Sequence, residues 1–121
     1  MIRQRGSAVV EFVLVVPLVL VVLLAAVEIA VIARTQLTVS QAAREGAREA
    51  ATSPDPERAV GVVRHFLGPD LGSGARVSVS RDHVVGGRAE VVVVVHHRVA
   101  APFFGGWPIK LQGRSSMRVE R

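Results

Sequence analysis

Residues 8–33 read AVVEFVLVVPLVLVVLLAAVEIAVIA, and this apolar block decides how the rest of the chain is organised. Glu11 and Glu28 are its only charged residues. An α-helix of this length would be about 39 Å long, whereas the hydrocarbon core of a bilayer is about 30 Å thick. The two glutamates would lie about 25 Å apart along it, so each is expected near an opposite membrane interface. The block predicts a transmembrane helix, which we assign to residues 7–33.

Pro17 lies inside this predicted helix. It has no backbone N–H, and it leaves the carbonyl of Val13 without its helical partner. One interpretation is an ordinary kink in a membrane helix. The other is a weak point that lets the helix stretch or bend when it packs into an assembly.

The remainder, residues 34–121, has the composition of one small globular domain. The chain has 121 residues and a formal net charge of +5, and every basic residue except Lys110 is an arginine. It has no dense basic run with interleaved aromatic residues, so nucleic acid is not a predicted partner. The absence of cysteine excludes disulfides, thiolate metal sites and cysteine nucleophiles.

Residues 34–52 are expected to continue the helix in an amphipathic form. Small residues recur on one face, at Ala43, Ala47 and Ala51. Such a face lets another helix or a sheet approach closely. Beside it run two charged stripes, Arg44 with Arg48 and Glu45 with Glu49. Like charges recur at i+4, so pairing within the helix is poor, and the stripes are either a solvated face or a contact with a neighbouring subunit.

A second helix and three strands are predicted after Thr52. Pro54 and Pro56 end the first helix, Asp55 caps the second, and Gly68-Pro69 ends it. The strand segments show alternating patterns, with a central strand from Arg88 to Val99. That strand is apolar on both faces, so both are expected to need cover. The predicted fold class is α+β, with a three-stranded antiparallel sheet packed on the helix.

The segment between the last two strands is rich in glycine and proline and carries three aromatic residues, Phe103, Phe104 and Trp107. These residues either fold back into the core or form a contact patch for a partner or for the membrane interface.

Residues 1–6 form a short basic leader. Arg3 and Arg5 favour a cytoplasmic N-terminus, which places residues 34–121 on the outer side. The apolar stretch is too long for an ordinary secretory signal, and no A-x-A cleavage site follows it.

The pattern R-x-R-G-S-A-V-V-E-F at residues 3–12 resembles a prepilin-type leader. The resemblance implies that a membrane aspartyl peptidase cuts between Gly6 and Ser7 and leaves the helix attached. Glu11 then becomes the fifth mature residue, followed by the aromatic Phe12. A carboxylate in lipid is costly alone, and the new N-terminal ammonium of a staggered neighbouring subunit would neutralise it.

The chain as a whole resembles the TadE-like family, the pseudopilins of tight-adherence pilus systems. The resemblance rests on RGSAVVEFVLVVPLVL at the start, Glu28, QAAREGAREAA at residues 41–51 and SSMRVER at the end. It implies a pilin-like fold and a structural role in pilus biogenesis. It also implies an inner-membrane location before any transfer to a surface pilus. The implied partners are a prepilin-type peptidase, other pilus or secretion-system subunits and further copies of the chain.

No catalytic residue, cofactor or metal site is predicted. The chain lacks a nucleophile elbow, a phosphate loop and a dinucleotide-binding turn. His96 and His97 are adjacent on a predicted strand and face opposite sides, so they do not share a metal easily.

The leading hypothesis is a minor pseudopilin that is extracted into, or primes, a pilus. The first alternative is a signal-anchored envelope protein that never polymerises and whose domain is a binding module. The second is a domain secreted after ordinary cleavage near Ala33.

Overall fold

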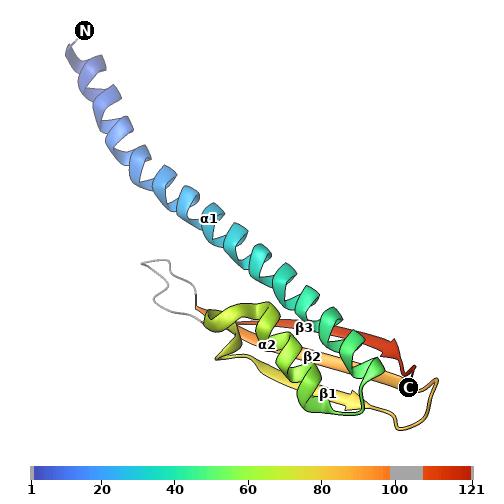
Figure 1. The fold of residues 1–121 in the computed structure, drawn as a ribbon. Helices are drawn as coiled ribbons and strands as arrows, with labels where there is room; N and C mark the ends of the chain where they lie inside the picture. Colours follow the sequence, from blue (N-terminus) through green and yellow to red (C-terminus); the bar gives the residue numbers. More distant parts are fainter. Residues whose placement is uncertain (1, 99–107, 121) are drawn as a thin grey trace.

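The computed structural model describes residues 2–98 and 108–120 and has the predicted α+β architecture (Figure 1). Its elements are α1 (Ile2–Thr52), α2 (Pro56–Gly72), β1 (Arg76–Arg81), β2 (Arg88–Arg98) and β3 (Pro108–Arg118). The segment that carries Phe103, Phe104 and Trp107 lies outside the described residues, so both interpretations of it stay predictions.

Helix α1 is one continuous element of 51 residues that runs through Pro17. Its first half stands clear of the domain, and its second half packs along the sheet (Figure 1). The predicted continuation of an apolar helix into an amphipathic one is therefore confirmed.

The three strands form an antiparallel sheet in the order β1-β2-β3, so β2 is central as predicted. Ala89, Val91 and Val93 of β2 are fully buried beneath the helices. Val92 and Val94 alternate with them on the opposite face and are half-buried. Among the described residues, helices cover only one face of the sheet, so the expectation that both faces need cover is wrong. On the other face, Val92 lies opposite Arg114 and Val94 opposite Gln112. The apolar stems of such long polar side chains can shield valines, which suits an antiparallel sheet with one solvated face.

Small residues let α1 approach both α2 and the sheet. Ala43 and Ala47 have no exposed surface. A Cβ added to Gly46 would lie 2.5 Å from Cγ2 of Val63 in α2 and 3.2 Å from Cγ1 of Val91 in β2. The predicted small-residue face is therefore the place where three elements meet.

Helix α1 and strand β3 run side by side. The side-chain amide of Gln36 donates a hydrogen bond of 2.9 Å to the carbonyl of Gln112. Gly113 packs directly against the backbone of Val39. Further along, the N–H of Glu120 donates to the carbonyl of Ala51 over 2.9 Å. These contacts hold the strand against the second half of α1.

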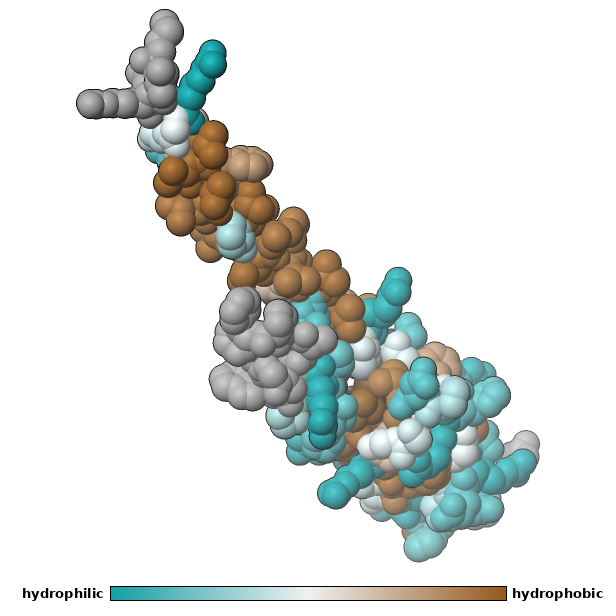
Figure 2. All heavy atoms as spheres, turned by 90° about the vertical axis from the view of Figure 1, so that its left-hand side faces the viewer, coloured by the Kyte–Doolittle hydropathy of each residue, from teal (hydrophilic) through white to brown (hydrophobic). Residues whose placement is uncertain are grey.

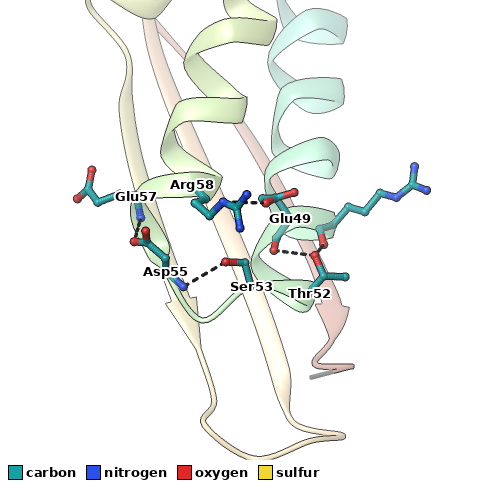
Figure 3. A network of polar contacts seen from close by, with 7 residues as sticks. Glu49, Thr52, Ser53, Asp55, Glu57 and Arg58 are labelled. Carbon is teal, nitrogen blue, oxygen red and sulfur yellow. Dashed lines mark hydrogen bonds and ion pairs between the residues drawn. The ribbon is translucent and has the colours of Figure 1, made fainter.

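Helix α2 begins as predicted and extends beyond its predicted end. The carboxylate of Asp55 accepts a hydrogen bond of 3.0 Å from the N–H of Glu57, and Pro56 occupies the first turn (Figure 3). Gly68 breaks the helix with a φ of 82° and a ψ of 173°. A further turn follows from Pro69 to Gly72, because proline is well suited to restart a helix.

Candidate functional site: the apolar helix and its junction with the domain

Between Ala8 and Val27, α1 carries apolar residues on all sides except at Glu11, and none of these residues is buried by the part of the chain that the structure describes. Its most apolar window is long enough to cross a membrane, and none of it is buried (Figure 2). Phe12 and Leu14 are each 70% exposed, and Leu18 is 63% exposed. A core helix of a soluble protein would bury such residues, whereas a helix that is hydrophobic all round and unburied suits lipid.

The residues predicted for processing lie at the free end of this helix. Gly6, Ser7, Glu11 and Phe12 are all exposed within α1. A Cβ added to Gly6 would meet no atom within 4 Å. The packing of the chain therefore places no demand for glycine at this position, and any such demand would come from a partner molecule.

A short contact between a carboxylate and an imidazole marks the point where α1 meets the domain. Oε1 of Glu28 lies 2.7 Å from Nε2 of His97, near the end of β2. The two side chains are only 17% and 18% exposed. Between Ala8 and Val27 the helix is exposed throughout, and this segment would be about 30 Å long, the thickness of a hydrocarbon core.

The spacing of the two glutamates predicts Glu28 near the far membrane interface, but it does not predict the pairing of Glu28 with His97. A signal was present, because His97 lies two residues beyond the buried Val95 and so shares its face of β2. The partner on α1 could not be read from that pattern.

The two charged stripes of α1 lie on different flanks of the helix. Glu45 and Glu49 line an open cleft of about 550 Å³ between α1 and α2. Glu49 also faces Arg58 of α2 at 3.7 Å, a contact that contributes little because Arg58 is mostly exposed (Figure 3). Arg48 lies on the other side of α1, beside Arg118 of β3.

Across the residues that the structure describes, no three histidine, cysteine, aspartate or glutamate side chains come together to hold a metal ion. His96 is exposed and His97 is mostly buried, in keeping with their places on opposite faces of β2.

Comparison with known proteins gives one family match. Residues 6–48 match the family model described as TadE-like protein. No curated protein and no solved structure matches the chain. The matched segment starts at the predicted leader glycine and runs through the apolar helix to the charged stripes. Residues 6–48 are therefore TadE-like, which confirms the predicted resemblance for this part of the chain; the C-terminal SSMRVER lies outside the matched segment.

Proposed function

We propose that this chain is a minor pseudopilin, a membrane-anchored subunit that is extracted into, or primes, a tight-adherence pilus. The observation that carries the proposal is a fully exposed apolar helix of bilayer length that continues without a linker into a packed domain. The TadE-like match over residues 6–48 supports a role in tight-adherence pilus systems.

The helix lies with its N-terminus in the cytoplasm and the domain of residues 34–121 outside. Arg3 and Arg5 precede the apolar segment, against Arg34 after it, which supports this orientation. A prepilin-type peptidase removes residues 1–6 on the cytoplasmic side.

Cleavage places a new ammonium group at Ser7, four residues before Glu11. On a helix these two residues lie about 6 Å apart along the axis. A neighbouring subunit displaced by about that distance would bring its ammonium level with the Glu11 carboxylate, which otherwise lies alone among apolar side chains. Glu11 is thus the assembly residue, and Phe12 extends the apolar surface beside it.

The intact mass of the mature protein, isolated from its own membranes, tests the proposal. Loss of residues 1–6 is expected. A full-length chain would instead support an anchored binding module that does not polymerise, and loss of everything to about Ala33 would support a secreted domain.

Two variants separate processing from assembly. Gly6→Val is expected to leave the precursor uncut, and the open space around Gly6 means that the fold is unaffected. Glu11→Ala is expected to be cut normally and to enter the pilus poorly. Normal assembly of Glu11→Ala would refute the charge-neutralisation role, and normal cleavage of Gly6→Val would refute the processing site.

A further inference from the structure

We propose that copies of this chain associate side by side in the membrane in a head-to-tail manner, through the two flanks of the second half of α1. The inference rests on the proposed membrane anchoring and names the subunit contact that such anchoring permits. Each flank combines charges of one prevailing sign with one exposed apolar side chain, and the two flanks are complementary.

The first surface, the acidic flank, is the cleft between α1 and α2. Glu45 and Glu49 contribute two carboxylates against the single guanidinium of Arg58. Phe66 lies in the same cleft and is 42% exposed, so its ring offers apolar contact area to a partner. Gly61 leaves the cleft open, since a Cβ there would meet no atom within 4 Å.

The second surface, the basic flank, lies between α1 and β3. Arg48 and Arg118 line it, together with the carboxylate residue Glu120. Arg44 lies one helical turn before Arg48 on the same stripe of α1. Met117 is 38% exposed here, so it offers a flexible apolar side chain to an aromatic ring.

Several of these charges have no counter-ion among the described residues. Across the described part of the chain, Arg44, Glu45 and Arg48 form no ion pair. Glu49 has only the long and exposed contact with Arg58. The interior of the fold therefore does not explain why the two signs are sorted onto opposite flanks.

The membrane sets the relative height of two copies, because the same apolar segment immerses each of them to the same depth. Arg44 of one copy is then level with Glu45 of the next to within about 1.5 Å, the rise of one residue. A two-fold contact through either flank alone would instead bring like charges together. A head-to-tail contact also leaves one flank free at each end, so it extends to further copies.

Disulfide trapping tests the contact, because the natural chain contains no cysteine. Gly61→Cys places a thiol on the acidic flank, and Met117→Cys places one on the basic flank. The two full-length variants are purified separately, mixed in lipid nanodiscs or liposomes and oxidised. We expect about tenfold more disulfide dimer from the mixture than from either variant alone, since a few weak contacts together supply about one decade of affinity.

Charge reversal provides the second measurement. Glu45→Arg and Arg48→Glu, each added to both cysteine variants, should lower the yield about tenfold. A mixture of chains with Arg48→Glu and Gly61→Cys and chains with Glu45→Arg and Met117→Cys should restore the yield. In this mixture the two flanks that carry the cysteines both keep their natural charges. Asp70→Arg, an equal charge change on an exposed residue outside both flanks, should leave the yield unchanged.

The outcomes separate this inference from the proposed function. Protein that resists carbonate extraction from membranes but gives no dimer in any mixture would refute self-association and leave the anchoring intact. Dimers from Gly61→Cys alone would refute the head-to-tail arrangement. Cross-links to another protein in cells, without dimers of the purified chain, would show that a different subunit fills the cleft and would also refute it.

Discussion

Replacing Gly113 with alanine should destabilise the domain, although a Gly→Ala change stabilises a chain wherever the native backbone accepts it. Gly113 lies in β3, at a point where the strand packs against the backbone of α1. A Cβ built at this position lies 2.7 Å from the carbonyl oxygen of Val39 and 2.9 Å from its carbonyl carbon. Both atoms belong to the backbone of α1, so no rotamer change relieves the contact, and β3 and α1 must move apart.

The expected loss follows from two opposing effects. Forcing a methyl group into a packed interior costs about 1–3 kcal/mol. Restricting the unfolded chain by Gly→Ala returns about 0.4–1 kcal/mol. The free energy of unfolding should therefore fall by about 1.3 kcal/mol, the difference between the middle values of the two effects, and the Tm of a domain of this size by about 5–10 °C.

The measurement is thermal unfolding of the purified full-length chain in detergent, followed by circular dichroism. Gly61→Ala is the matched control, because a Cβ there meets no atom within 4 Å and the residue lies inside α2. It should raise stability by about 0.5–1 kcal/mol, the usual difference between alanine and glycine in a helix. A Gly113→Ala variant that melts at or above the wild-type temperature would show that the contact between α1 and β3 is not as close as described.

Two further predictions concern the ends of the packed half of α1. Replacing Glu28 or His97 with alanine should speed amide exchange in α1 between Glu28 and Gln36 by about 10- to 100-fold, while exchange in β2 stays slow. The reason is that losing a hydrogen bond to a charged group costs about 1.5–3 kcal/mol. Equal exchange in the wild type and both variants would contradict this. Asp55→Ala should lower the free energy of unfolding by about 1 kcal/mol, because the N–H of Glu57 loses its cap. Asp55→Asn should retain most of that stability, since asparagine also caps well. Equal Tm values for the two variants would count against the cap.

The local patterns predicted most of the fold. The apolar block predicted the exposed half of α1, Asp55 with Pro56 predicted the start of α2, and alternation predicted the strands, with β2 as the central one. Each of these depends on neighbours in sequence, for which period and capping preferences are strong. The end of α2 was predicted one turn early, because a helix can restart after Gly68 when proline follows.

Contacts between residues that are distant in the chain could not be predicted from local sequence patterns. Glu28 and His97 are 69 residues apart, and pairing them requires knowing how high on α1 the end of β2 lies. The sorting of the charged stripes onto two flanks likewise depends on which side of α1 receives α2, which no periodicity specifies. The sequence likewise did not predict that only one face of the sheet is covered, because this depends on where both helices pack.

The unbroken course of α1 has a mechanical consequence. A 51-residue helix is about 77 Å long, and no flexible joint separates its lipid-facing half from the half fastened to the sheet. Torque or tension applied to the outer domain is therefore transmitted through one continuous helix, whose hydrogen-bond ladder lacks one bond at Pro17. A machine that pulls the domain away from the membrane would therefore pull the apolar half of α1 with it, because the two move as one body.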